Sequence, residues 1–554
     1  MSTLEERLGP GSVRGEGEKS SYRRVAAGPG EPRLLRRELF SEPGELRPGR
    51  RRSLLHIAHV TDMQLADVAS PGRFEFFESL RGLPGTGAFI PAQRPQESLA
   101  AYAIDATLRR IERAQSQETG APVDLVVSTG DAIDNAQWNE LLAYLALLGG
   151  GEVALFPGGR YAGVQQRGES ELYWQPEGGG DLWRRQHGFP VLPGLLDRAA
   201  RPFAAGGSSL AWLSCFGNHE GLAFGESVPT AAYRRLLLGS TKAHSLPPGL
   251  EPLGKEEELF SHPEAFLCGP SLEVPADPDR RVVGRREYVA AHLTAPGRPA
   301  GHGLGPANLA DATTYFAYDA APAVRLIVLD TANLDGDHEG SLGARQFAWL
   351  EGELESCHTS WLDAEGRRRL GPGPDRLVVL ASHHGLSSLT NSVRPPGGIE
   401  PDRPRVGREE LRRLLERFPN VVCWLNGHRH LNEIVAHRSR ARGPGGSLAG
   451  YFEISTAAIA DWPSQGRLVE LVANEDGTLS ILTTMLDHAG PASPGDEAVP
   501  ADASEQARDW LASLHRELAA NVPGAGFGSK REGRSRDRNC ELLVSLPFPL
   551  ESSP

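Results

Sequence analysis

Apolar runs of strand length recur along the chain, and a short polar cluster directly follows five of them. The runs cover residues 54–60, 123–128, 210–216, 377–381 and 421–425. The clusters that follow, in the same order, are Asp62-Met63-Gln64, Gly130-Asp131, Gly217-Asn218-His219-Glu220, His383-His384 and Gly427-His428-Arg429-His430. Short, continuous apolar runs are typical of strands buried on both faces. Because the carboxyl ends of parallel strands meet at one edge of a sheet, we expect the clusters to lie together.

The rest of the pattern predicts an α/β protein in which helices and strands alternate. Helical spacing of apolar residues occurs at 96–115, 138–148, 346–355, 408–418 and 504–520. Period-2 or buried runs predict an antiparallel pair at 313–318 and 324–330, and later strands at 450–455, 466–472, 478–486 and 540–546. This order favours two mixed sheets packed face to face with helices outside.

Three regions are expected along the chain. Residues 1–52 are polar and rich in Gly, Pro and Arg, which predicts an N-terminal extension, and residues 53–490 form the main domain. Residues 491–554 add a C-terminal helix and strand that pack on that domain. Two insertions, at about 149–209 and 241–306, are long enough to be functional. The aromatic residues of the first favour walls of a substrate pocket, with plain surface packing as the alternative.

Composition narrows the function classes. The chain has 554 residues, and 58 basic against 71 acidic side chains give a net charge of −13, which disfavours a nuclease or another nucleic-acid-binding protein. The five cysteines are scattered without a CxxC motif, which indicates a reducing compartment. The longest apolar run, 141–148, is too short to cross a bilayer. We therefore expect a cytoplasmic protein without membrane contact, although an exported protein whose leader has been removed fits as well.

The ordered clusters resemble the calcineurin-like metallophosphoesterase superfamily. Within it, Gly130-Asp131-x-x-Asp134-Asn135-Ala136-Gln137, Ser382-His383-His384 and Asp461-Trp462-Pro463 are similar to a bacterial subgroup with long insertions. The resemblance runs from about residue 54 to 488. It implies a four-layer αββα sandwich and a hydrolase acting on ester bonds, in which two divalent metal ions activate a hydroxide.

The resemblance also implies the roles of individual residues. Asp131 would bridge the two ions. The remaining ligands would be Asp62, Gln64 and His430 at one ion, and Asn218, His383 and His428 at the other. Spacing of i, i+2 places side chains on one side of an extended segment, which suits Asp62 with Gln64 and His428 with His430. His219 would be the catalytic residue that donates a proton or hydrogen bond to the substrate.

Gln64 departs from the superfamily pattern, which has histidine at this position. An amide oxygen is a harder ligand than an imidazole, so we expect Mn²⁺, with Mg²⁺, Fe or Zn²⁺ as alternatives. The alternative is that Gln64 binds the metal ion only through a water molecule.

Supporting roles are expected for several neighbours. Glu220 would orient His219 or act as an acid at a helix N-terminus. Asp134 and Asn135 would cap the following helix and support Asp131. His384 would pack behind the ligands or contact substrate, and Arg467 is a weaker candidate for a phosphate clamp.

The sequence thus predicts hydrolysis of a small-molecule phosphomonoester or phosphodiester. The alternative is a metal-binding protein that is catalytically weak or silent, which the change at Gln64 favours. Oligomeric state is not predicted.

Overall fold

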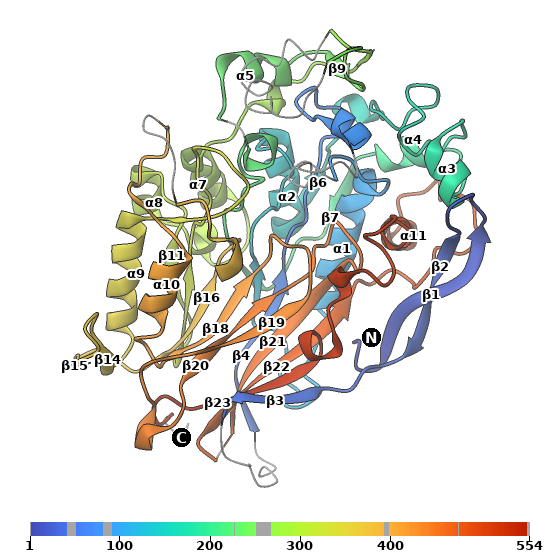
Figure 1. Cartoon of the computed structure of the whole chain (residues 1–554). Helices are drawn as coiled ribbons and strands as arrows, with labels where there is room; N and C mark the ends of the chain where they lie inside the picture. The colour runs from blue at the N-terminus through green and yellow to red at the C-terminus, as the bar shows by residue number, and fades with distance from the viewer. Residues whose placement is uncertain are drawn as a thin grey trace.

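The computed structural model describes residues 2–40, 51–80, 91–226, 228–250, 268–392, 398–474 and 476–550. Within them the chain is a mixed α and β protein built around two large sheets (Figure 1). Residues 41–50 of the predicted extension and 251–267 of the second predicted insertion lie outside the described residues. Among the described helices, none combines the length and the apolar character that a bilayer crossing requires.

The first sheet has seven strands and carries the first three polar clusters. Strands β4, β5 and β8 run parallel to one another, whereas β21 and β22 are antiparallel to their neighbours. In spatial order the strands are β3 (Leu34–Leu39), β23 (Cys540–Ser545), β22 (Thr478–Asp487), β21 (Gln465–Asn474), β4 (Arg51–Val60), β5 (Leu125–Ser128) and β8 (Ala211–Ser214).

The second sheet has six strands and carries the other two clusters. Its four central strands are parallel, and both edge strands, β11 and β19, pair antiparallel with their neighbours. The spatial order is β11 (Phe316–Ala321), β12 (Val324–Val328), β16 (Leu377–Ala381), β18 (Val421–Asn426), β20 (Gly450–Ser455) and β19 (Glu433–Arg438).

The predicted elements are confirmed, with small shifts at their ends. Each of the five clusters follows a strand of one of the two sheets, and the antiparallel pair β11–β12 forms as expected. The predicted helices are α1 (Ala100–Ile111), α2 (Trp138–Gly149), α9 (Ala344–Ser356), α10 (Arg408–Leu415) and α11 (Glu505–Ala520). Helix α11 begins where Ser504 accepts a hydrogen bond from the backbone N–H of Ala507, as an N-cap residue does.

Shorter elements decorate this frame. The helices are α3 (Leu182–His187), α4 (Leu195–Ala199), α5 (Ala231–Leu237), α7 (Arg285–Thr294) and α8 (Pro306–Asp311). The paired short strands are β6 (Gly151–Val153) with β7 (Phe203–Ala205), β9 (Thr241–Ala243) with β10 (Ser271–Glu273), β13 (Leu342–Gly343) with β17 (Arg405–Val406), and β14 (Ser360–Leu362) with β15 (Arg368–Leu370).

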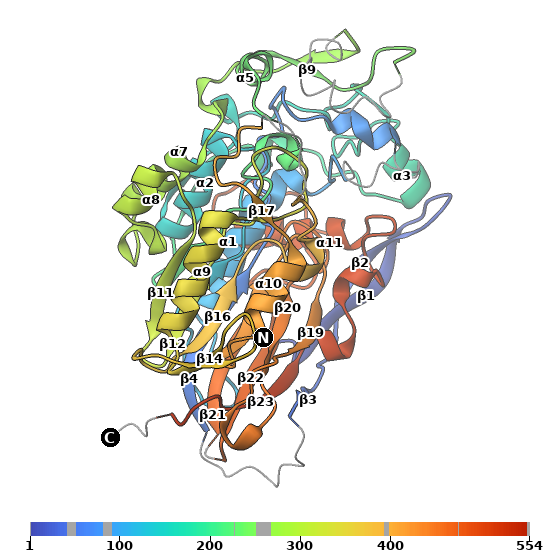
Figure 2. The same cartoon turned by 60° about the vertical axis from the view of Figure 1, so that its left-hand side comes forward.

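Alternate side chains of the second sheet enter two different cores. Ile327, Val378 and Leu380 pack with residues of α9 and α10, which lie beside this sheet in Figures 1 and 2. Leu326 and Val379 point the other way and join the large core that also holds residues of the first sheet. Because successive side chains of a strand face opposite sides, a continuous apolar run can supply both cores.

The N-terminal extension is a folded part of the molecule. Strands β1 (Glu6–Gly15) and β2 (Tyr22–Pro29) form an antiparallel hairpin. Figure 1 shows it beside α11, and Val25 packs there with Ala519 and Ala520. Strand β3 adds to the first sheet, parallel to β23.

The aromatic residues of the first insertion pack internally. Tyr173 and Trp174 are 0% and 1% exposed. The Trp174 ring packs edge-on against Phe189, with ring centroids 5.9 Å apart. The Tyr173 hydroxyl donates to the backbone oxygen of His244. These side chains therefore stabilise the insertion by packing, which agrees with the second of the two expectations, plain packing, and not with pocket walls.

His59 joins the two sheets near the carboxyl ends of their strands. It lies on β4, and its ring nitrogens are each 2.8 Å from a threonine hydroxyl: Thr129 after β5, and Thr456 after β20 of the other sheet. Burial, reinforced by the charge of Arg467, lowers the pKa of His59 to about 3. The ring is therefore neutral in the folded protein at neutral pH.

We predict that acidification destabilises the protein partly through His59. The unfolded chain takes up a proton below about pH 6.5, whereas folded His59 stays neutral until about pH 3. Stability from this residue is thus complete above pH 6.5 and declines by about 1.4 kcal/mol per pH unit as pH falls through that window. Urea unfolding across the window should show a shallower decline for His59→Gln, and an unchanged decline would contradict this account.

Candidate metal centre

The five clusters meet at the edge where the carboxyl ends of both sheets come together. Among the clusters of the first sheet, the backbone N–H of Asp62 donates to the backbone oxygen of Gly130. Among those of the second sheet, the backbone N–H of Gly427 donates to the backbone oxygen of His383. A ring nitrogen of His383 lies 2.8 Å from the backbone oxygen of Thr129, which links the sheets. All seven predicted ligands lie at this edge.

One group gathers around Asp62. The Nε2 atom of His430 lies 3.1 Å from Asp62 Oδ1. The side-chain amide of Gln64 is 3.3 Å from that same imidazole nitrogen and 3.1 Å from Nε2 of His219. The side chain of Gln64 thus reaches the centre.

A second group gathers around Asn218. Its Oδ1 atom lies 2.9 Å from His383 Nε2 and 3.1 Å from His428 Nδ1. Asp131 connects the groups, since its Oδ2 atom is 3.1 Å from His383 Nε2. The ligand atoms of Asp62, Asp131 and His383 all lie within 4.8 Å of one another. Asp131 is therefore placed where both groups can share it.

Five of the seven predicted ligands have left-handed backbone. Their φ angles are 50° at Asp62, 43° at Gln64, 51° at Asp131, 66° at His428 and 51° at His430. Residues other than glycine seldom adopt this conformation, and each instance costs about 1–3 kcal/mol unless its surroundings impose it. Such residues concentrate at functional sites, so this clustering marks the edge as one.

The donor set fits divalent cations. Among the described residues, the buried Gln64 Oε1 has no hydrogen-bond partner, and the buried Asp62 Oδ1 meets only the imidazole of His430, at 3.1 Å. A buried, unpaired oxygen is costly unless a proton donor or a cation satisfies it. Two carboxylates, two amide side chains and three imidazoles also provide the ligand types that Mn²⁺ and related ions accept.

Opposite charges hold the ligands together at the bridge. Burial disfavours a charged imidazole, but the carboxylate of Asp131 outweighs it and raises the pKa of His383 to about 9. Against its own burial, the pKa of Asp131 is held well below the usual range by His383 and His219. A metal ion would replace the proton on His383, since ligands bind in deprotonated form.

Asp461 is a supporting residue that stood out in the sequence only through the Asp461-Trp462-Pro463 motif. Its Oδ2 atom lies 2.6 Å from Nδ1 of His430, the ring nitrogen that faces away from Asp62. Arg94 Nε donates to its other oxygen, and Arg531 lies 2.5 Å from Oδ2. A carboxylate at this position fixes the orientation and tautomer of a metal-binding histidine. Arg531 brings the C-terminal region into the centre.

His384 serves as a supporting residue as well. Its ring nitrogens are 2.8 Å from the Thr331 hydroxyl and 2.8 Å from the backbone oxygen of His338. Burial, together with the charge of His383, lowers its pKa to about 3. With both nitrogens engaged, His384 packs behind His428 and does not add a ligand.

The expected role of Glu220 is wrong. Its carboxylate accepts backbone N–H bonds from Gly217, Asp131 and Ala132 and does not orient His219. It therefore ties the second and third clusters together. Gly217 is required at this contact, because a Cβ atom there would collide with the Asp131 carboxylate.

Asp134 and Asn135 do not cap helix α2. Its N-cap residue is Gln137, which makes no side-chain capping bond. Asp134 instead orients His219, whose Nδ1 lies 2.9 Å from the Asp134 backbone oxygen, while Arg73 binds the Asp134 carboxylate. The Asn135 side-chain oxygen accepts from the backbone N–H of Ala223.

Arg467 is not a phosphate clamp. It is 1% exposed, and its guanidinium donates to Thr456, Asn432 and backbone oxygens of the C-terminal segment. Its function is therefore to hold that segment against strand β21.

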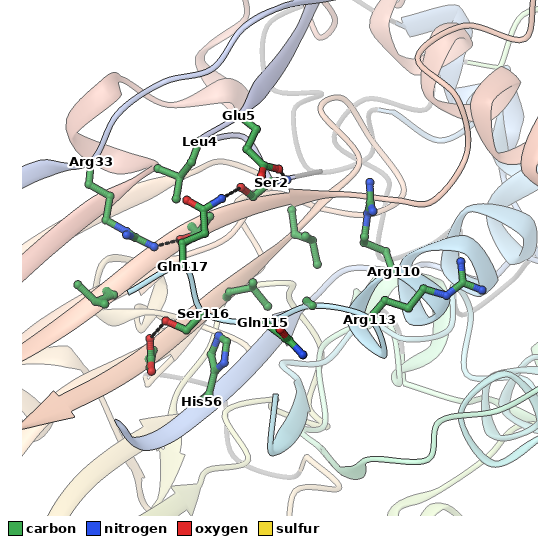
Figure 3. A pocket seen from close by; sticks show the side chains of 16 residues that line it. Ser2, Leu4, Glu5, Arg33, His56, Arg110, Arg113, Gln115, Ser116 and Gln117 are labelled. Carbon is green, nitrogen blue, oxygen red and sulfur yellow. Dashed lines mark hydrogen bonds between the residues drawn. The ribbon is translucent and has the colours of Figure 1, made fainter. Parts of the chain in front are cut away.

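A separate pocket of about 220 Å³ lies between the N-terminal segment and strands β21 and β22 (Figure 3). Arg33, His56 and Arg110 line it, and none of its described lining residues belongs to the five clusters. The metal centre is thus distinct from this pocket.

We predict that Asp461→Asn weakens metal binding by about ten- to a hundredfold, because His430 loses the carboxylate that orients it. Calorimetric titration with Mn²⁺ measures the effect. Asp375→Asn is the matched control, since Asp375 holds His358 at 2.5 Å in the same manner away from the centre. Equal affinity in the Asp461 variant and the control would show that this contact is not needed.

Comparison with models of protein families and with curated proteins finds no match to the chain. Function is therefore inferred from the centre itself: its seven converging side chains, its unpartnered Gln64 oxygen and its left-handed backbone.

Proposed function

We propose that the protein is a phosphoester hydrolase that uses two divalent metal ions. The observation that carries the proposal is the sharing of Asp131 between two ligand groups at the joined edges of the sheets. We also propose the finer architecture, a four-layer αββα sandwich, which the two cores on either face of the second sheet support.

The two ions would have separate ligand sets. Asp62, Gln64 and His430 would hold one, whereas Asn218, His383 and His428 would hold the other, with Asp131 common to both. When bound, such a pair neutralises phosphoryl charge and lowers the pKa of an attacking water. Mn²⁺ is the ion that the oxygen of Gln64 favours.

His219 is the catalytic residue of this proposal. The Asp134 carbonyl fixes its Nδ1, so that its Nε2 points into the centre, 3.7 Å from Asp131 Oδ2. Its side chain is 12% exposed, which leaves one edge open to a ligand. Because the Asp134 carbonyl accepts the proton of Nδ1, Nε2 carries a proton only when the ring is cationic. Against the effect of burial, the carboxylates of Asp131 and Asp134 raise the pKa of His219, and the protonated ring would donate from Nε2 to the oxygen of a departing group.

A small substrate suits this centre. The imidazoles of His219 and His430 are each only 12% exposed, so little of these two side chains is accessible to a substrate, which favours a small one. The net charge of −13 disfavours nucleic acid.

We predict that His219→Ala lowers kcat by about a hundredfold or more, as the loss of a general acid does. The substrates are p-nitrophenyl phosphate and bis(p-nitrophenyl) phosphate with added Mn²⁺. Both ions should stay bound, because the metal ligands are unchanged.

The same assay separates the two candidate functions. If the wild-type protein binds metal ions but hydrolyses neither ester, the catalytically silent metal-binding protein is correct. Turnover retained by His219→Ala would remove this residue from the mechanism while leaving the hydrolase proposal in place.

We further predict that Gln64→His shifts the metal preference from Mn²⁺ towards Zn²⁺. The imidazole is a softer ligand than the amide oxygen it replaces. Competition between the two ions, followed by metal analysis, measures the ratio. Tight stoichiometric zinc in both sites of the wild-type protein would refute the preference for hard metals.

A further inference from the structure

The loop from Asp330 to Ser341, between β12 and β13, lies over the second ligand group. His384, which packs behind His428, contacts the backbone oxygen of His338 at 2.8 Å. Asn391 donates to the backbone oxygens of Gly336 and Glu339, and Gly340 donates to Ser388. These bonds fix the loop relative to the metal centre.

The loop presents one histidine, His338, whose ring is held by a carboxylate. Its Nδ1 atom lies 2.5 Å from Oε1 of Glu226, which also lies 3.3 Å from the His338 backbone nitrogen. Gly336 permits this approach, since it has a φ of 97° and a Cβ there would lie 2.9 Å from the Glu226 backbone oxygen. Glu226 itself follows the Asn218 cluster, so two separate segments build the pair.

The His338 ring lies beside the second ligand group and is partly exposed. Its centroid is 6.0 Å from that of the predicted ligand His428, and the two rings are 25° from parallel. The His338 side chain is 34% exposed, compared with 12% for His219 and for His430. Glu226 and Asp337 face Nδ1, at 2.5 and 3.5 Å, whereas the nearest carboxylate to Nε2, that of Glu339, is 3.9 Å away. Nε2 therefore makes no short contact with these three carboxylates and is the ring nitrogen that can reach a ligand.

A second carboxylate-held histidine shows what a purely structural pair is like here. His358 Nδ1 lies 2.5 Å from Asp375 Oδ1, the same distance as in the Glu226 pair. The His358 side chain is only 5% exposed and packs near Phe548, away from the centre. His338 differs in being exposed and in facing a predicted metal ligand.

We propose that His338, positioned by Glu226, contacts the substrate by donating a hydrogen bond to a phosphoryl oxygen. This inference rests on the proposed phosphoester function. A histidine held by a carboxylate keeps a fixed orientation, so its free N–H can be aimed at one ligand atom. His338 thus extends the site beyond the seven ligands and His219.

The test is calorimetric titration of the Mn²⁺-loaded full chain with inorganic phosphate. His338→Ala should bind phosphate about ten- to a hundredfold more weakly, the size of one hydrogen bond to a charged group. His338→Gln keeps a donor at the end of the side chain and should retain part of the affinity. The matched control, His358→Ala, should bind like the wild-type protein.

Metal content and turnover complete the test. Both ions should stay bound in His338→Ala, and kcat/KM for p-nitrophenyl phosphate should fall about as much as the affinity for phosphate does. If His338→Ala loses its ions, the phosphate affinity of His338→Gln with both ions bound decides whether His338 contacts phosphate.

Phosphate affinity equal to the wild type in a metal-loaded His338 variant would overturn the inference. So would a third ion that the wild type binds and the variant lacks, because Glu226, Asp337 and His338 would then be metal ligands. If the wild-type protein binds phosphate through His338 but hydrolyses neither ester, the proposed function is wrong, whereas the contact between His338 and phosphate is confirmed.

Discussion

The structure depends on placing buried charged groups together where two sheets meet. Asp62, Asp131 and His383 are almost completely buried, and an isolated charge in such a place would be strongly destabilising. Their mutual contacts offset part of that cost, as the opposed pKa shifts of Asp131 and His383 indicate. Within the described residues Gln64 Oε1 has no hydrogen-bond partner and Asp62 Oδ1 meets only the imidazole of His430, and a cation at the centre would satisfy both oxygens.

The surrounding fold restrains these groups in an unfavourable conformation. Left-handed backbone at five ligand positions is held by short connections from strands that are buried on both faces. Further buried networks support the connections. Arg73 binds the carboxylates of Asp134 and Glu97, and Glu220 accepts backbone bonds from two clusters. Rigidity behind the centre therefore comes from polar contacts as well as from apolar packing.

The strands, the main helices and the convergence of the five clusters could be predicted from the sequence. Apolar runs have a strong local signal, and parallel strands deliver their carboxyl ends to one edge whatever lies between them. The supporting contacts could not be predicted in the same way. Asp461 with Arg531, and Glu226 with His338, join segments far apart in the chain, and no spacing rule connects them.

Errors arose where a local interpretation competed with a distant partner. Asp134 and Asn135 precede a helix and so suggested capping, yet Arg73 and Ala223 bind them. Arg467 suggested a phosphate contact, but the C-terminal segment surrounds it with backbone oxygens. The polar N-terminal extension carried no core pattern, although its hairpin packs beside α11.

The central claim is that Asp131 is shared by two metal ions. Electron paramagnetic resonance of the protein loaded with Mn²⁺ tests it most directly, because two Mn²⁺ ions joined by one carboxylate couple magnetically. The account predicts two ions per chain and a coupled spectrum that is lost in Asp131→Ala. A single uncoupled ion, or a spectrum that Asp131→Ala leaves unchanged, would contradict it.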